Sequence, residues 1–367
     1  MKKGMTLKKA VTMSSRAIGV FLIGAVCQNP VANAETSSWS FRIPGSETRP
    51  SVSSPKTKAK EKSTSTHIKQ VPGPEIKGAE PQLKATGEDA YLAFDQGRYL
   101  TALKLAEEAA AKGDAAAHTL IGRIYSEGHG VRPDDEVAAQ WYTRGAELGD
   151  VNAMFAIALM LAEGRGVKQD RAAAAEMFEK AAQTGHAEAN YNLGLLFLKG
   201  DGKPENPYRA AQHIAYAAEK GVAAAQYDLS ALYQTGTGVE ADAYQAAMWI
   251  SRAAAQGMAA AQYDYAVMLL GGHGLNKDGP KAIELLRAAA EKGIPGAQNR
   301  MAYVYRDGVN VEKSQLEMAK WRLIAKASGF EDKELDEEVA RLPAEVRANA
   351  ERAALEWSER AEIILPE

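Results

Sequence analysis

Apolar and small side chains recur every three or four residues along most of the chain beyond residue 89, the spacing of one face of a helix. Ala189, Leu193 and Phe197 show this spacing, and 36 residues later Ala225 and Leu229 repeat it. No segment alternates apolar and polar residues over a useful length, so no sheet is expected. The pattern predicts an all-α chain.

Glycine recurs with a fixed period of 36 residues. One series comprises Gly113, Gly149, Gly185, Gly221, Gly257, Gly293 and Gly329, and a second comprises Gly128, Gly164, Gly200, Gly236, Gly272 and Gly308. A third series runs through Gly130, Gly166, Gly202, Gly238 and Gly274 and ends in Asn310. Glycine in a left-handed conformation ends a helix, and asparagine is among the residues that best tolerate that conformation. A period of this length indicates stacked supersecondary units.

Residues that cap helices keep the same period. They are Asp134, Asp170, Asn206, Asp242, Asp278 and Ser314. These side chains accept hydrogen bonds from the first free amides of a helix, so each predicts the start of a second helix in its unit. The predicted fold is therefore a stack of helix–turn–helix repeats over residues 85–330. Residues 331–367 leave the pattern and predict closing helices, with Trp357 covering the apolar face of the last repeat.

The N-terminal 34 residues have the pattern of an export signal. Five basic and no acidic side chains precede an apolar run at 17–27, and Ala32 and Ala34 follow at the positions that a signal peptidase reads. An eleven-residue run is too short for a membrane anchor, which needs about 20 residues. Lipid modification of Cys27 is disfavoured because Val26 occupies a place where lipoprotein signals carry a small residue. Cleavage after Ala34 is expected, with a periplasmic or secreted product.

Residues 35–84 are rich in serine, threonine, proline and lysine and predict a disordered linker. Contact of its lysines with anionic envelope polymers is an alternative to a purely solvated tether. Residues 89–367 contain 30 basic and 41 acidic side chains, a net charge of −11. That charge argues against nucleic acid and against an anionic membrane surface as partners.

The repeats resemble the Sel-one-like repeat, a relative of the tetratricopeptide repeat with a longer, glycine-rich turn. The segments AEANYNLGLLFLKGDG, from residue 187, and AAAQYDLSALYQTGTG, from residue 223, carry this resemblance, which extends over about residues 89–330. Lys203 and Pro204, and Asn310, are local departures. The resemblance implies a right-handed α-solenoid that binds other proteins, and exported bacterial members serve in envelope assembly or signalling. A cysteine-rich minority is credited with β-lactam hydrolysis, but the chain lacks those cysteines.

No constellation for catalysis, cofactor binding or metal binding is recognisable in the sequence. The six histidines include no pair at H-x-x-x-H spacing, and Cys27 is the only cysteine. The glycine turns follow helices rather than strands, which makes a dinucleotide site a poor interpretation of them. We therefore expect no metal, no cofactor and no enzyme activity.

The face of each first helix opposite its core stripe is unusually apolar and aromatic. The predicted groove comprises Phe155, Leu159, Tyr191, Asn192, Leu195, Tyr227, Asp228, Tyr263, Asp264, Arg300 and Tyr303. A continuous exposed surface of this kind is typical of a protein-binding site. The alternative is that these side chains pack against the first helix of the next repeat.

Two functions remain open from the sequence. The first is an exported scaffold that holds a peptide or helix of a protein partner in the predicted groove, in envelope assembly or signalling. The second is an envelope enzyme or glycan binder that acts on peptidoglycan, for which a cleft with converging titratable groups would be required.

Overall fold

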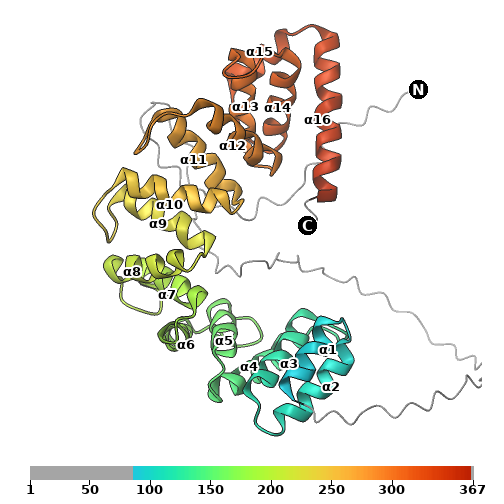
Figure 1. Ribbon diagram of the computed structural model, residues 1–367. Helices are drawn as coiled ribbons and strands as arrows, with labels where there is room; N and C mark the ends of the chain where they lie inside the picture. Colours follow the sequence, from blue (N-terminus) through green and yellow to red (C-terminus); the bar gives the residue numbers. More distant parts are fainter. Residues whose placement is uncertain (1–85, 365–367) are drawn as a thin grey trace, which may run out of the picture. The chain divides into compact units, whose positions relative to one another are not determined.

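The computed structural model describes residues 86–364, which form sixteen helices and no strand (Figure 1). The helices are α1 (Gly87–Asp95), α2 (Tyr99–Ala110), α3 (Ala115–Glu127), α4 (Asp135–Glu147), α5 (Val151–Glu163), α6 (Arg171–Gln183), α7 (Ala187–Lys199), α8 (Pro207–Glu219), α9 (Ala223–Thr235), α10 (Ala243–Ala255), α11 (Ala259–Gly271), α12 (Gly279–Glu291), α13 (Pro295–Asp307), α14 (Gln315–Ala327), α15 (Lys333–Arg341) and α16 (Ala344–Ile364). The predicted all-α solenoid is confirmed. The expected signal and the expected linker lie outside the described residues.

The described residues divide into two compact units, 86–148 and 149–364. The first contains α1–α4 and the second contains α5–α16. Within the second unit, odd- and even-numbered helices form antiparallel hairpins from α5/α6 to α13/α14, and the second helix of each hairpin packs against the first helix of the next. We call α3, α5, α7, α9, α11 and α13 the first helices of the repeats.

The capping residues act as predicted. The side chain of Asp170 accepts a hydrogen bond from the Ala173 amide at 2.9 Å, and Asn206 accepts one from Arg209 at 3.0 Å. Asp134, Asp242, Asp278 and Ser314 cap their helices in the same way. These bonds satisfy amides that have no partner inside the helix, so they fix where each second helix begins.

The third glycine series holds neighbouring repeats together. A Cβ at Gly238 would run into the backbone oxygen of Pro207, where the second helix of the preceding repeat starts, and Gly202 and Gly274 have equivalent contacts with Arg171 and Ala243. Only glycine lets the two backbones approach so closely. These turns therefore set the spacing of the stack as well as ending helices.

A row of buried amides, not anticipated from the sequence, ties the first helices to the preceding repeats. Gln226, Gln262 and Gln298 each donate a hydrogen bond from Nε2 to a backbone oxygen eight residues earlier, at the end of the preceding second helix. Asn190 makes the same bond to Ala182. Each of these oxygens also accepts the amide of the glycine three residues later, so the side-chain bonds add to the turn at the helix end and join it to the next hairpin.

The last repeat is covered by α15 and α16. Trp357 of α16 is buried, packs edge-to-face on Trp321 of α14, and donates a hydrogen bond to Glu291 at 2.7 Å. The predicted covering role of Trp357 is thus confirmed. None of the helices in the described part of the chain is both long and apolar enough to cross a membrane.

Candidate functional site

All eleven residues of the predicted groove lie on the first helices α5, α7, α9, α11 and α13, but their exposure differs. The buried members are Leu159, Tyr191, Asn192 and Leu195. The half-buried members are Phe155, Tyr227, Asp228, Tyr263, Asp264 and Tyr303, and Arg300 is exposed. Packing between repeats therefore buries the members from Leu159 to Leu195, whereas Phe155 and the members from Tyr227 onward keep access to solvent.

Tyrosine–aspartate hydrogen bonds connect successive first helices. The Tyr191 hydroxyl donates to Asp228 at 2.8 Å, and the Tyr227 hydroxyl donates to Asp264 at 2.6 Å. Each bond joins residues 37 positions apart, one repeat plus one residue. The polar residues that the sequence suggested as contacts for a partner thus hold the tyrosines of the preceding repeat.

Burial controls the ionisation of the second of these pairs. It raises the pKa of Asp264 above its usual value, and the hydrogen bond from Tyr227 opposes that rise. The pKa of Tyr227 is raised as well, first by burial and then by the charge of Asp264. Tyr227 therefore remains a neutral donor, and its hydroxyl is what stabilises a carboxylate at position 264.

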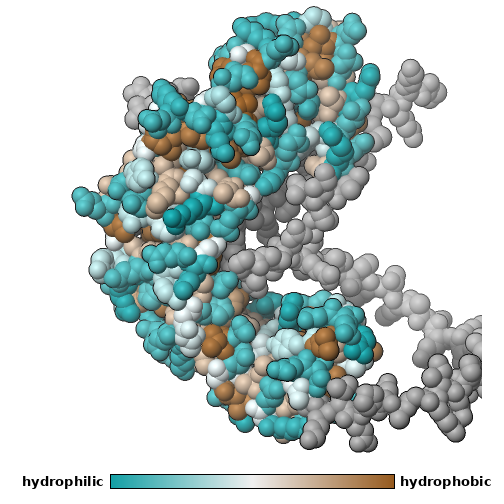
Figure 2. All heavy atoms as spheres, in the orientation of Figure 1, coloured by the Kyte–Doolittle hydropathy of each residue, from teal (hydrophilic) through white to brown (hydrophobic). Residues whose placement is uncertain are grey.

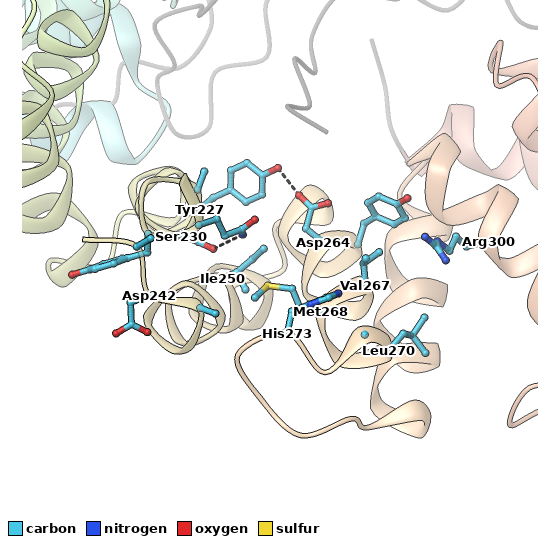
Figure 3. A pocket seen from close by; sticks show the side chains of 17 residues that line it. Tyr227, Ser230, Asp242, Ile250, Asp264, Val267, Met268, Leu270, His273 and Arg300 are labelled. Carbon is cyan, nitrogen blue, oxygen red and sulfur yellow. Dashed lines mark hydrogen bonds between the residues drawn. The ribbon is translucent and has the colours of Figure 1, made fainter. Parts of the chain in front are cut away.

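A cavity of about 880 Å³ opens beside this pair, lined by residues of α9, α10, α11, the α11–α12 turn and α13 (Figure 3). Four residues of the predicted groove line it: Tyr227, Tyr263, Asp264 and Arg300. Figure 3 shows Val267 and Met268 on α11, with Arg300 reaching in from α13. The volume is within the range of pockets that enclose small ligands, and the walls combine apolar side chains with a few polar groups.

Several residues that line the cavity were not among the predicted groove residues. They include Ser230, Gln234, Met268 and His273. Gln234 donates to the buried Ser230 hydroxyl at 3.3 Å. Ser230 and Gln234 stand three and seven residues after Tyr227, so helical spacing would have placed them on the same face. His273 belongs to the turn after α11, and no helical period points to it.

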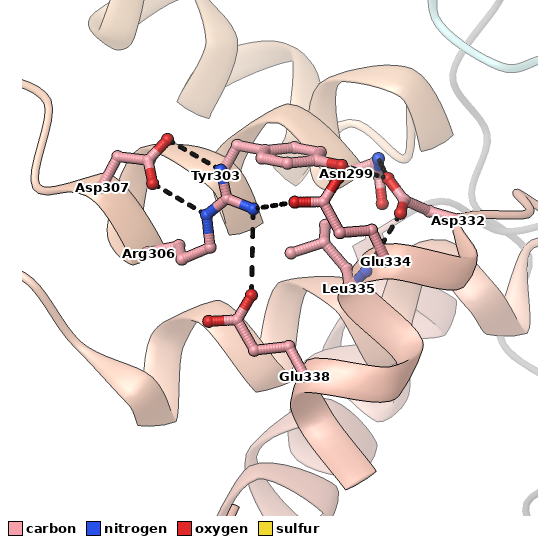
Figure 4. A network of polar contacts seen from close by, with 8 residues as sticks. All are labelled: Asn299, Tyr303, Arg306, Asp307, Asp332, Glu334, Leu335 and Glu338. Atoms are coloured by element: carbon pink, nitrogen blue, oxygen red, sulfur yellow. Dashed lines mark hydrogen bonds and ion pairs between the residues drawn. The ribbon is translucent and has the colours of Figure 1, made fainter. Parts of the chain in front are cut away.

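Tyr303 belongs to a different environment, at the closed end of the array (Figure 4). Its hydroxyl donates to Asp332 at 2.9 Å, and Asn299 donates to the same carboxylate at 2.8 Å. Burial alone would raise the pKa of Asp332, but these donors and the Leu335 amide lower it. Burial and Asp332 together raise the pKa of Tyr303 to about 12.

Arg306 lies on the ring of Tyr303 and forms ion pairs with Asp307 and Glu334, both at 2.7 Å. This network fastens α15 to α13. Tyr303 therefore has a structural role at the end of the array and does not line the cavity.

Strongly apolar residues on the face shown in Figure 2 form separate small patches in a mostly hydrophilic surface. Scattered patches of this size are normal on a soluble protein surface. Among residues 86–364, no group of three or more histidine, cysteine, aspartate or glutamate side chains is placed to hold a metal ion. The cavity is therefore the feature of the described residues that best fits a binding site.

A family model for the Sel1 repeat matches six consecutive segments, at residues 115–150, 151–186, 187–222, 223–258, 259–294 and 295–321. The chain belongs to the Sel1 repeat family. Sel1 repeats generally mediate protein–protein interactions and are typically non-enzymatic. The cavity lies between the fourth and fifth matched repeats and reaches the sixth through Arg300.

Solved structures of Sel1 repeat proteins are similar to this chain. A Sel1 repeat protein from Oxalobacter formigenes is 28% identical, with a TM-score of 0.59 over 66% of this chain and 99% of that one. The protein c5321, a protective antigen of uropathogenic Escherichia coli, is 24% identical, with a TM-score of 0.49 over 77% of this chain and 74% of that one. No curated protein matches the chain.

Proposed function

We propose that the protein is an exported scaffold that binds a peptide or helix of a partner protein in the cavity between its fourth and fifth repeats, in envelope assembly or signalling. The observation that carries the proposal is the cavity itself, which is lined by half-buried tyrosines next to apolar side chains. Tyrosine rings supply contact area at low entropic cost, and such rings dominate the energetics of protein interfaces.

Membership of the Sel1 repeat family supports a protein as the partner. Export rests on the basic start, the short apolar run and the small residues at Ala32 and Ala34. An enzyme would need titratable groups that converge on a substrate, whereas Tyr227 and Asp264 in this cavity pair with each other.

A cavity-filling substitution tests the proposal. Ala231 lines the cavity and is half-buried, so Ala231→Trp places an indole in the space that a partner would use. The matched control is Ala255→Trp, at an exposed position on α10. We expect proteins that co-purify from crosslinked envelope fractions with the wild type and with Ala255→Trp to be lost from Ala231→Trp.

An unchanged set of co-purified proteins in Ala231→Trp would contradict binding in the cavity. Circular dichroism melts of the three proteins control for folding. The alternative of a glycan binder is tested in the same preparation. Retention of purified peptidoglycan fragments by the wild type, without any bound protein, would favour that alternative.

A further inference from the structure

The series of tyrosine–aspartate hydrogen bonds between successive first helices stops inside the cavity. Tyr191 and Tyr227 each donate to an aspartate 37 residues later, but the residue 37 positions after Tyr263 is Arg300. Within residues 86–364, neither the Tyr263 hydroxyl nor the Arg300 guanidinium has a hydrogen-bond or ion-pair partner. The cavity therefore contains two donor groups that the fold leaves free.

The Tyr263 hydroxyl and Arg300 are both located along one part of α13. A Cβ at Gly296 would stand 3.1 Å from the Tyr263 hydroxyl oxygen, so the end of the tyrosine ring rests on α13 at that glycine. Arg300 follows Gly296 by four residues on the same helix and so occupies the same face one turn later. Figure 3 shows the Arg300 side chain directed into the cavity.

The chemistry of the pair favours a carboxylate. A guanidinium presents parallel N–H donors that match the two oxygens of a carboxylate, and the phenol adds one more donor. Asp264 lines the same cavity and carries a negative charge when ionised. A single Arg300 beside that carboxyl group suits a monoanion better than a doubly charged phosphate.

We propose that Tyr263 and Arg300 bind the side-chain carboxylate of a glutamate or aspartate in an extended segment of the partner. This inference rests on the proposed function and names the partner's chemistry. The apolar wall at Val267, Met268 and Leu270 receives a neighbouring apolar side chain of the segment. A segment that follows successive first helices continues on both sides of the cavity, so the carboxylate comes from a side chain rather than from a chain end.

The register supplies a variant that is expected to fold. Arg300→Asp gives Tyr263 the acceptor that Tyr191 and Tyr227 already have, and it removes the cation. The matched control is Arg287→Asp, which makes the same charge change at an exposed position on α12 outside the cavity lining. Tyr263→Phe removes the hydroxyl alone. Thermal melts of all variants check that the fold is retained.

The probe is a positional-scanning library of N-acetylated, C-amidated octapeptides with glutamate, glutamine or lysine fixed at one position. For the full chain and for Arg287→Asp, we expect the best glutamate pool to bind more tightly than the matching glutamine pool. The concentration that gives half-saturation should be at least about tenfold lower for the glutamate pool. Arg300→Asp should lose this preference and favour lysine. Tyr263→Phe should show an intermediate preference.

Each other outcome overturns the inference in a distinguishable way. If peptides bind without a preference for glutamate, the carboxylate assignment is wrong while binding in the cavity stands. If Arg300→Asp keeps the preference, Arg300 does not contact the acid. Binding by a free-acid version of the pools, without binding by the amidated pools, would assign the site to a chain end. Absence of binding by every pool would show that the cavity does not bind such peptides. An unchanged set of co-purified proteins in Ala231→Trp would contradict the proposed function on which this inference rests.

Discussion

At the scale of single residues, glycine has two physically different roles in the repeat. Gly221 and Gly238 both have positive φ, at 95° and 71°. No atom stands near a Cβ built on Gly221, whereas a Cβ on Gly238 would overlap the backbone at Pro207 and Tyr208. The first glycine is needed only for its conformation, and the second is also needed for its small size.

Substitution by alanine separates the two roles. Gly221→Ala should cost about 1–2 kcal/mol of unfolding free energy, the cost of a left-handed alanine. Gly238→Ala should cost at least about 3 kcal/mol, because repeats must also move apart. Urea denaturation of the two variants measures the difference. Equal losses would mean that the turn does not set the spacing of the stack.

The bond between Tyr227 and Asp264 predicts a pH-dependent effect. Tyr227→Phe removes a donor to a half-buried carboxylate and should cost about 2 kcal/mol near neutral pH. Because that donor opposes the rise in the pKa of Asp264, its loss raises the pKa further. The cost should therefore shrink as pH falls and Asp264 becomes protonated in the folded state.

Unfolding free energies at pH 7 and pH 4 measure this change. The control Tyr208→Phe alters an exposed tyrosine and should have no effect at either pH. A cost for Tyr227→Phe that does not decrease in acid would show that Asp264 is not the group stabilised.

Caps and glycine stops could be predicted because each depends on residues within one turn of itself. The solvent exposure of the predicted groove residues could not be predicted in this way. Tyr191 and Tyr263 occupy the same register, yet one is buried and the other half-buried. The exposure of each ring depends on how the neighbouring repeat packs against it, and this packing cannot be deduced from residues within one turn.

At the scale of elements, the attachment of α15 depends on one buried cation. Arg322 of α14 is fully buried and forms an ion pair with Asp336 at 2.7 Å, and it also donates to Asn299 and to the Phe330 backbone oxygen. Burial alone would raise the pKa of Asp336, but hydrogen bonds from Arg322 and Lys326 lower it. The closing helices were expected from the end of the repeat pattern, but this ion pair was not.

Asp336→Asn should cost about 3 kcal/mol at pH 7, because it leaves a buried guanidinium without a countercharge. A depressed pKa in the folded state means that this stabilisation is present above the usual aspartate pKa and is lost as pH falls through the folded value. The variant and the wild type should therefore converge in acid. The control Glu337→Gln removes an exposed pair with Arg341 and should change stability by less than about 0.5 kcal/mol.

Chemical denaturation across pH 2–7 tests this prediction. A constant difference between Asp336→Asn and the wild type at all pH values would indicate lost packing rather than a lost charge.

At the scale of the whole molecule, export is the prediction that the described residues leave open. The N-terminal pattern predicts cleavage after Ala34, so intact mass and N-terminal peptide analysis of the protein from its native host should find a chain that begins at Glu35. Ala34→Arg should block processing, because the peptidase requires a small residue there. A mature chain that retains residues 1–34 in both proteins would contradict export by this signal.

The fold of the whole array followed from its period, but the site did not. Four of the eleven predicted groove residues line the cavity, and the others pack between repeats or belong to the closed end. Helical periodicity pointed to the first helices, which carry the four predicted residues that line the cavity. It could not show that Tyr263 and Arg300 lack a partner among the described residues.

Photocrosslinking in intact cells tests the central claim, that the cavity is where the protein binds its partner. A photoreactive amino acid in place of Gln234 stands at the exposed rim of the cavity, and one in place of Glu284 stands at an exposed position on α12. We predict a discrete crosslinked species from position 234 that is absent from position 284. No species from either position, or the same species from both, would contradict the account.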